Sequence, residues 1–107
     1  MSPLSNTNHY QYVYGKLSET VYRLAVGEGD VRGRLKWACE VYNSFDSSLL
    51  PTELHEKWDW INSELSKFPP NYGKTAQEIT LLKIRNSTGS KVAKAIVSLK
   101  SALEQYL

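Results

Sequence analysis

The sequence predicts an all-α fold, a compact antiparallel bundle of four to five helices. Apolar residues recur at the three- and four-residue spacing of a helix face in several segments of the 107-residue chain. No segment alternates between apolar and polar residues for long enough to indicate a strand. The connections between the helical segments are short, and short connections make consecutive helices antiparallel neighbours.

The chain has the size and composition of one domain. Its residues are 41% hydrophobic and 22% charged, as in an ordinary globular protein. We expect residues 9–107 to form a single helical-bundle domain after a flexible segment at residues 1–8. A lone cysteine, Cys39, fits a reducing compartment. Neither a secretory signal nor an apolar run of about 20 residues is present, so we expect a cytoplasmic protein that does not contact membranes.

The first two helices are expected at residues 9–26 and 31–45. Gly27 and Gly29 end the first apolar stripe. Asp30 then stands at the N-cap of the second helix, where a carboxylate accepts free backbone N–H groups. The stripe of the second helix is wide enough to contact two neighbours, so this helix is expected to be central.

A third helix is expected at residues 53–68. Thr52 is its candidate cap, and Pro69 and Pro70 stop it because proline has no N–H to donate. Its apolar stripe is the narrowest in the chain. The stripe consists of Leu54, Trp58, Ile61, Leu65 and Phe68.

The last two helices are expected at residues 76–86 and 91–106. Thr75 and Glu78 match the capping box, in which the two side chains satisfy each other's backbone N–H groups. The apolar residues of the fourth helix fall on two sides, which indicates packing between neighbours. The two segments could also form one kinked helix, depending on the stretch between them.

That stretch, residues 85–91, reads RNSTGSK. It is not a P-loop, because it has one glycine and no preceding strand. One interpretation is a turn in which Ser90 or Ser87 caps the last helix and Gly89 supplies a backbone angle that other residues avoid. A second is an anion site at the start of that helix, where free N–H groups would be joined by cationic side chains. The candidate residues are Arg85, Ser90, Lys91 and Lys94.

No catalytic, cofactor or metal site is predicted. His9 and His55 are far apart and have no metal-ligand or nucleophile spacing. The acidic residues of the third helix point away from its apolar stripe, whereas a di-metal bundle needs inward carboxylates. We therefore expect a protein that is not an enzyme.

Trp60 is the most unusual aromatic residue. It lies about 120° from the apolar stripe of the third helix, on the polar side. It either covers the neighbouring loop at residues 71–72 or forms an exposed anchor for a protein partner, since tryptophan is enriched in binding hot spots. Its acidic surroundings argue against stacking on nucleic acid. The candidate protein-binding residues are Trp60, Glu53, Glu56 and Glu64.

Charge is unevenly distributed along the sequence. The net charge is +1 in residues 1–45, −3 in residues 46–68 and +4 in residues 71–107, giving the total of +2. We expect a small adaptor or regulatory protein that binds another protein or another copy of itself. The alternative is a binder of nucleic acid or a phosphate ligand through the basic C-terminal half, although a net charge of +2 is low for that class.

Overall fold

The computed structural model describes residues 3–107 for the backbone and residues 9–107 for the side chains. This part of the chain contains five α-helices and no strands. The prediction of an all-α bundle is confirmed, with 77% of the chain helical. Every helix in this part is too short or too polar to cross a membrane. The helices are α1 (Pro3–Val26), α2 (Val31–Tyr42), α3 (His55–Leu65), α4 (Ala76–Lys83) and α5 (Asn86–Leu103), with 3₁₀ turns η1 (Ser47–Leu49), η2 (Thr52–Leu54) and η3 (Glu104–Tyr106).

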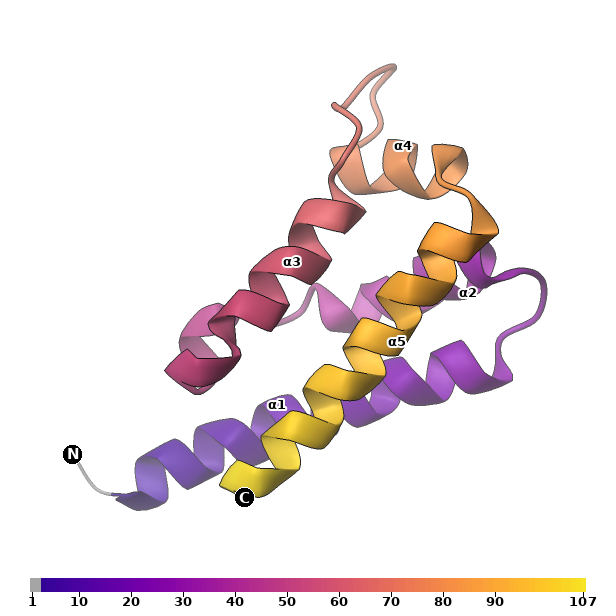
Figure 1. Cartoon of the computed structure of the whole chain (residues 1–107). Coiled ribbons are helices and arrows are strands. Elements are labelled where there is room, and N and C mark those ends of the chain that lie inside the picture. The colour runs from indigo at the N-terminus through magenta and orange to yellow at the C-terminus, as the bar shows by residue number, and fades with distance from the viewer. Residues whose placement is uncertain (1–2) are drawn as a thin grey trace.

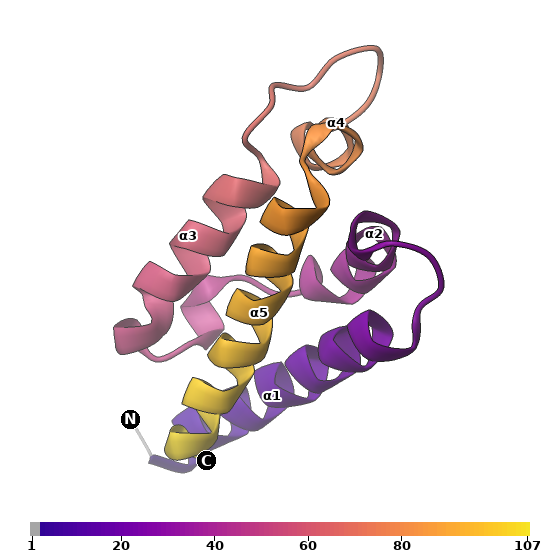
Figure 2. The same cartoon turned by 45° about the vertical axis from the view of Figure 1, so that its right-hand side comes forward.

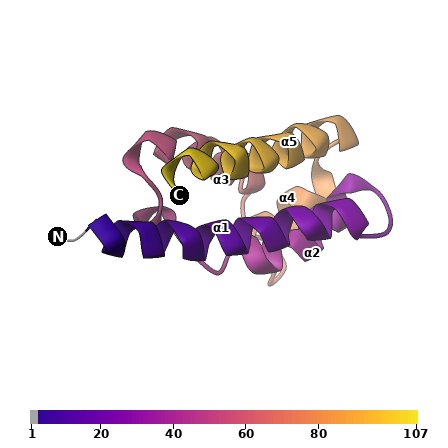
Figure 3. The same ribbon diagram turned by 90° about the horizontal axis from the view of Figure 1, so that it is seen from below.

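The helices lie in two layers. Helices α1 and α2 form one layer, α3 and α5 form the other, and α4 closes one end (Figures 1 and 3). Helix α5 packs against α1, α2 and α3, so it shares the central position that we expected for the second helix. The side chains between the layers are almost fully buried. They include Val13, Leu17, Leu35, Tyr42, Ile61, Leu65, Ile96 and Leu99.

Helix α1 is longer than expected. It begins at Pro3, so residues 3–8 belong to the helix that we expected to begin at residue 9. Residues 1 and 2 of the expected flexible segment lie outside the described residues. The cap of α2 is as predicted, because the Asp30 carboxylate accepts hydrogen bonds from the backbone N–H groups of Arg32 and Gly33 at 3.0 and 3.2 Å.

Helices α2 and α3 are shorter than expected. Helix α2 ends at Tyr42, where Ser44 N–H and hydroxyl both donate to the Val41 carbonyl and turn the chain. Thr52 does not cap α3, since it opens the η2 turn that leads into the helix. Helix α3 ends at Leu65, because Ser66 already leaves the helical backbone angles with φ −120° and ψ 25°. The predicted stop at Pro69 lies four residues further on, so the prolines do not set the end of this helix.

Helices α4 and α5 are separate, and the capping box of α4 is present as predicted. The break lies at Ile84 and Arg85, whose backbones are extended. Ile84 is buried in the core, and its carbonyl accepts a hydrogen bond from Arg32 Nη1 at 3.3 Å. Our placement of Ser90 or Ser87 as a cap and of Gly89 in a turn is wrong. All three lie inside α5, which begins at Asn86 and not at the expected residue 91.

Candidate functional site

A hollow of about 460 Å³ lies between α3 and α5. The two helices run side by side (Figures 1 and 2). We call this hollow the α3–α5 groove. The residues that line it are Glu53, Glu56, Lys57, Trp60, Ala95 and Ser98. The structure thus brings together three of the four predicted protein-binding residues. Glu64, one turn beyond Trp60, is half-buried and is not among these lining residues.

The indole of Trp60 differs from those of the other two tryptophans. Trp58 is 8% exposed, and its ring stacks on Tyr42 at 4.7 Å between centroids. Trp37 is 40% exposed, but the Arg23 guanidinium lies 4.8 Å from its ring centroid. Trp60 is 44% exposed, and no ring or cation among the described side chains stacks on it. The exposed part of Trp60 is therefore available to a ligand.

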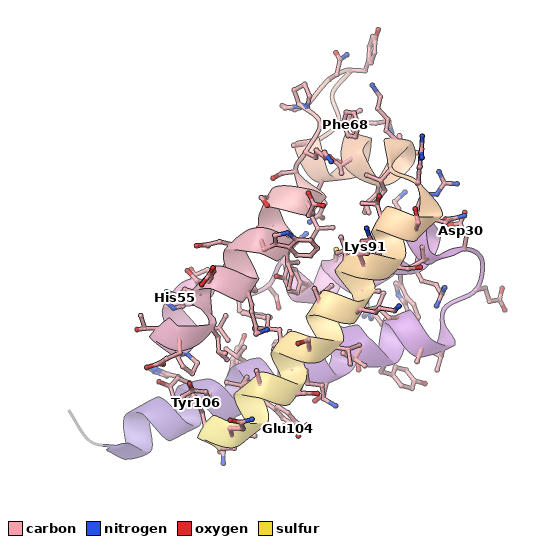
Figure 4. All side chains as sticks on the ribbon, in the orientation of Figure 1. Asp30, His55, Phe68, Lys91, Glu104 and Tyr106 are labelled. Carbon is pink, nitrogen blue, oxygen red and sulfur yellow. The ribbon has the colours of Figure 1, made fainter. Side chains whose placement is uncertain are left out.

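Neither carboxylate of the groove forms an ion pair among the described residues. The three ion pairs among residues 9–107 involve Arg23 and Arg32 with other acids, and none includes Glu53 or Glu56. Partial burial, the negative charge of Glu53 and a side-chain hydrogen bond to Glu53 raise the pKa of the Tyr106 phenol, so Tyr106 already contacts this carboxylate. Figure 4 shows Tyr106 at the end of the molecule where α3 begins. The groove thus presents an aromatic face beside two acids and one ammonium group.

Trp60 does not cover the loop between α3 and α4. Tyr72 in that loop is 89% exposed, the highest value among the large apolar side chains that the structure describes. Asn71 and Lys74 exchange backbone hydrogen bonds at 2.9 and 3.2 Å around a two-residue turn. Both turn residues have positive φ, 51° at Tyr72 and 74° at Gly73. We expected only a loop at this segment, because no local pattern in the sequence signals the turn at its tip.

The predicted anion-binding residues do not converge. Arg85 lines a hollow of about 220 Å³ together with Lys67, Lys83 and Thr88. Lys94 lines a different hollow, beside α1. Lys91 belongs to neither lining, and Ser90 lies on the exposed side of α5. Sequence reasoning missed the cluster around Arg85 because its members come from three separate segments.

The remaining reactive groups lie in the core or contact the backbone. Burial raises the pKa of the Cys39 thiol to about 12, so the group is protonated at neutral pH. His55 Nε2 lies 3.1 Å from the Leu50 carbonyl oxygen. Among the side chains of residues 9–107, no three of histidine, cysteine, aspartate or glutamate gather closely enough to hold a metal ion.

Comparison with known proteins identifies no relative. No family model, curated protein or solved structure matches the chain.

Proposed function

We propose that this chain is a non-enzymatic adaptor or regulatory protein that binds a protein partner through the α3–α5 groove. The observation that supports this most strongly is the free face of Trp60 in a hollow of about 460 Å³. Burying a tryptophan contributes more to an interface than burying almost any other side chain, both through apolar area and through specific ring contacts. The buried cysteine of the chain, Cys39, forms no disulfide, which is consistent with action in the cytoplasm.

The groove favours a partner segment that combines an apolar or aromatic side chain with a cation. The apolar part would cover the indole of Trp60. A lysine or arginine beside it would meet Glu53 or Glu56, and a cation over the indole face would gain a further electrostatic attraction. Such charge complementarity sets orientation and association rate more than it sets affinity.

Affinity capture with matched variants tests this proposal. Trp60→Ala removes the groove aromatic, whereas Tyr22→Ala removes an aromatic that is 57% exposed on α1. We expect a protein that is retained by the unmodified chain and by Tyr22→Ala, and that is depleted about tenfold or more with Trp60→Ala. Circular dichroism establishes that both variants are folded. If every captured protein binds equally to the three chains, the groove is not the binding surface.

Anion binding is a second candidate function, supported by the cluster of Lys67, Lys83 and Arg85. No carboxylate of the described residues lies within 4 Å of these cations. A phosphate group or nucleic acid would provide the missing negative charge. We expect binding of a single-stranded oligonucleotide that weakens steeply with salt and that is lost in the double variant Lys83→Gln/Arg85→Gln.

The matched control for anion binding is Lys91→Gln/Lys94→Gln, which removes the same charge from the residues that the structure separates. An equal loss in both double variants would show that net charge, and not the cluster, is responsible. No binding at low salt would exclude this second function.

A further inference from the structure

We propose that the α3–α5 groove accepts the tip of the loop between α3 and α4 of a second copy of this chain, so that Tyr72 of one copy packs on Trp60 of the next. This inference rests on the proposed protein-binding function and names its partner. Two features support it: a projecting aromatic tip closed by backbone hydrogen bonds and a concave aromatic groove, which carry opposite charges.

The backbone of the tip forms a closed turn that leaves the Tyr72 side chain exposed. The backbone hydrogen bonds between Asn71 and Lys74 close the turn, and Asn71 Oδ1 accepts a further one from Tyr72 N–H at 2.9 Å. The φ of 51° at Tyr72 is one that glycine or asparagine adopts more readily. A tyrosine there strains the backbone and leaves its ring 89% exposed, which is understandable if the ring contacts a partner.

The base of the loop is fixed to α4. The backbone N–H of Phe68 donates to the buried hydroxyl of Thr80 at 3.0 Å. The Lys83 ammonium lies 5.4 Å from the centroid of the Phe68 ring. Figure 4 shows Phe68 beside α4, below the projecting part of the loop. Because hydrogen bonds already hold the backbone at the base and at the turn of the loop, the entropy cost of binding would come mainly from the Tyr72 side chain.

The two surfaces have complementary charge. Residues 66–85, which form the loop and α4, contain four cations and one carboxylate, whereas the lining of the groove contains two carboxylates, Glu53 and Glu56, and one lysine, Lys57. The lone carboxylate, Glu78, is engaged in the capping box with Thr75. The net charges are therefore +3 for the loop and α4 and −1 for the lining of the groove. The four cations are Lys67, Lys74, Lys83 and Arg85, all exposed.

The tip and the groove lie at opposite ends of α3. The groove residues begin at Glu53 and end at Trp60 on this side, whereas the tip follows the end of the helix at Leu65. Figures 1 and 2 show the loop projecting beyond α3 and α4. One copy therefore cannot place its own tip in its own groove. A head-to-tail contact leaves one free tip and one free groove, so assembly continues into rings or filaments.

Sedimentation and light scattering over a concentration series test for self-association. One loop tip in one groove buries a small area, so the contact belongs to the weak class and needs concentrations up to about 1 mM. We expect the mass to rise above the 12.2 kDa of one chain with concentration and to fall again with added salt. A mass of one chain throughout would overturn the inference.

A mixing experiment tests which surfaces meet. Trp60→Ala removes the groove aromatic and keeps the tip, whereas Tyr72→Asn removes the tip aromatic and keeps a residue that tolerates positive φ. We expect each variant alone to remain at one-chain mass. Their equimolar mixture should form a species of twice 12.2 kDa and nothing larger, because one tip and one groove remain intact. A mixture that stays at one-chain mass, or single variants that still assemble, would overturn the inference.

The outcomes separate this inference from the proposed function. If the unmodified chain stays at one-chain mass while a different protein is captured in a Trp60-dependent way, the groove still binds protein and only the second-copy inference fails. If neither self-association nor Trp60-dependent capture is found, both fail.

Discussion

A Cβ atom added to Gly89 would lie 2.8 Å from Cγ1 of Val31. Helices α5 and α2 therefore cross so closely at this point that only glycine fits. A glycine inside a helix costs about 1 kcal/mol relative to alanine. The close packing of the two helices offsets that cost. It also explains why a glycine, which we expected in a turn, lies inside α5.

We predict that Gly89→Ala lowers the free energy of unfolding by about 1–3 kcal/mol, since the new methyl group overpacks the crossing. Val31 is β-branched and cannot easily rotate away. Gly15→Ala is the matched control, because no described atom lies within 4 Å of a Cβ there. It should raise the free energy of unfolding by about 1 kcal/mol through helix propensity alone. Urea denaturation measures both, and equal stability of the two variants would contradict the close crossing.

Tyr42→Phe should leave stability unchanged or raise the free energy of unfolding by about 1 kcal/mol. The Tyr42 side chain is fully buried, and its hydroxyl has no hydrogen-bond partner among the described residues. Removing the hydroxyl removes an uncompensated desolvation cost and keeps the stack on Trp58. Tyr42→Leu keeps the apolar character but loses the stack, so thermal unfolding should rank it below Tyr42→Phe. A clear loss of stability in Tyr42→Phe would show that the hydroxyl has a partner in solution.

The elements that the sequence predicted best are those set by local chemistry. Asp30 and the pair Thr75 and Glu78 cap their helices as expected, because a cap involves only the next three residues. The start of α5 was missed because Arg85 has no acceptor that could signal a cap. The break there depends on burial of Ile84 and on a hydrogen bond from Arg32, 52 residues away in sequence.

Only part of the candidate site could be predicted from the sequence. Trp60 lies off the apolar stripe of its helix, and helical geometry alone places it on the outer side with Glu53 and Glu56. Its partner wall, Ala95 and Ser98, comes from α5 and carries no local signal. The exposed tip at Tyr72 could not be predicted either, since tyrosine rarely adopts the positive φ that the turn requires.

The Cys39 thiol should be unreactive in the folded chain. It is 1% exposed, and burial raises its pKa to about 12, so both access and thiolate content are low. At pH 8 we expect a disulfide reagent to label it at least about a hundredfold more slowly than in denaturant, where the chain is open. The labelling rate should follow the stability of the variants above, rising in Gly89→Ala. Rapid labelling of the native chain would place Cys39 in an accessible, mobile region.

Stability should fall below about pH 4, because three carboxylates hold the backbone at helix or turn starts. Hydrogen bonds from Arg32 and Gly33 lower the pKa of Asp30, those from Ser48 lower that of Asp46, and those from Thr75 lower that of Glu78. The ordinary pKa is 3.8 for the two aspartates and 4.5 for Glu78, and the pKa in the folded chain is lower for each of them. The stability that these carboxylates contribute is therefore present above the ordinary values. It is lost as the pH falls through them toward the folded-state pKa.

Asp30→Asn tests the origin of this acid sensitivity. Asparagine caps a helix about as well as aspartate but does not titrate, so the variant should unfold at nearly the same temperature at pH 7 and lose less between pH 5 and about pH 3. Asp59→Asn is the control, since Asp59 is exposed within α3 and caps no helix. Thermal unfolding across this pH range decides the question. If both variants lose stability with acid as the unmodified chain does, the cap at Asp30 does not contribute to the pH dependence.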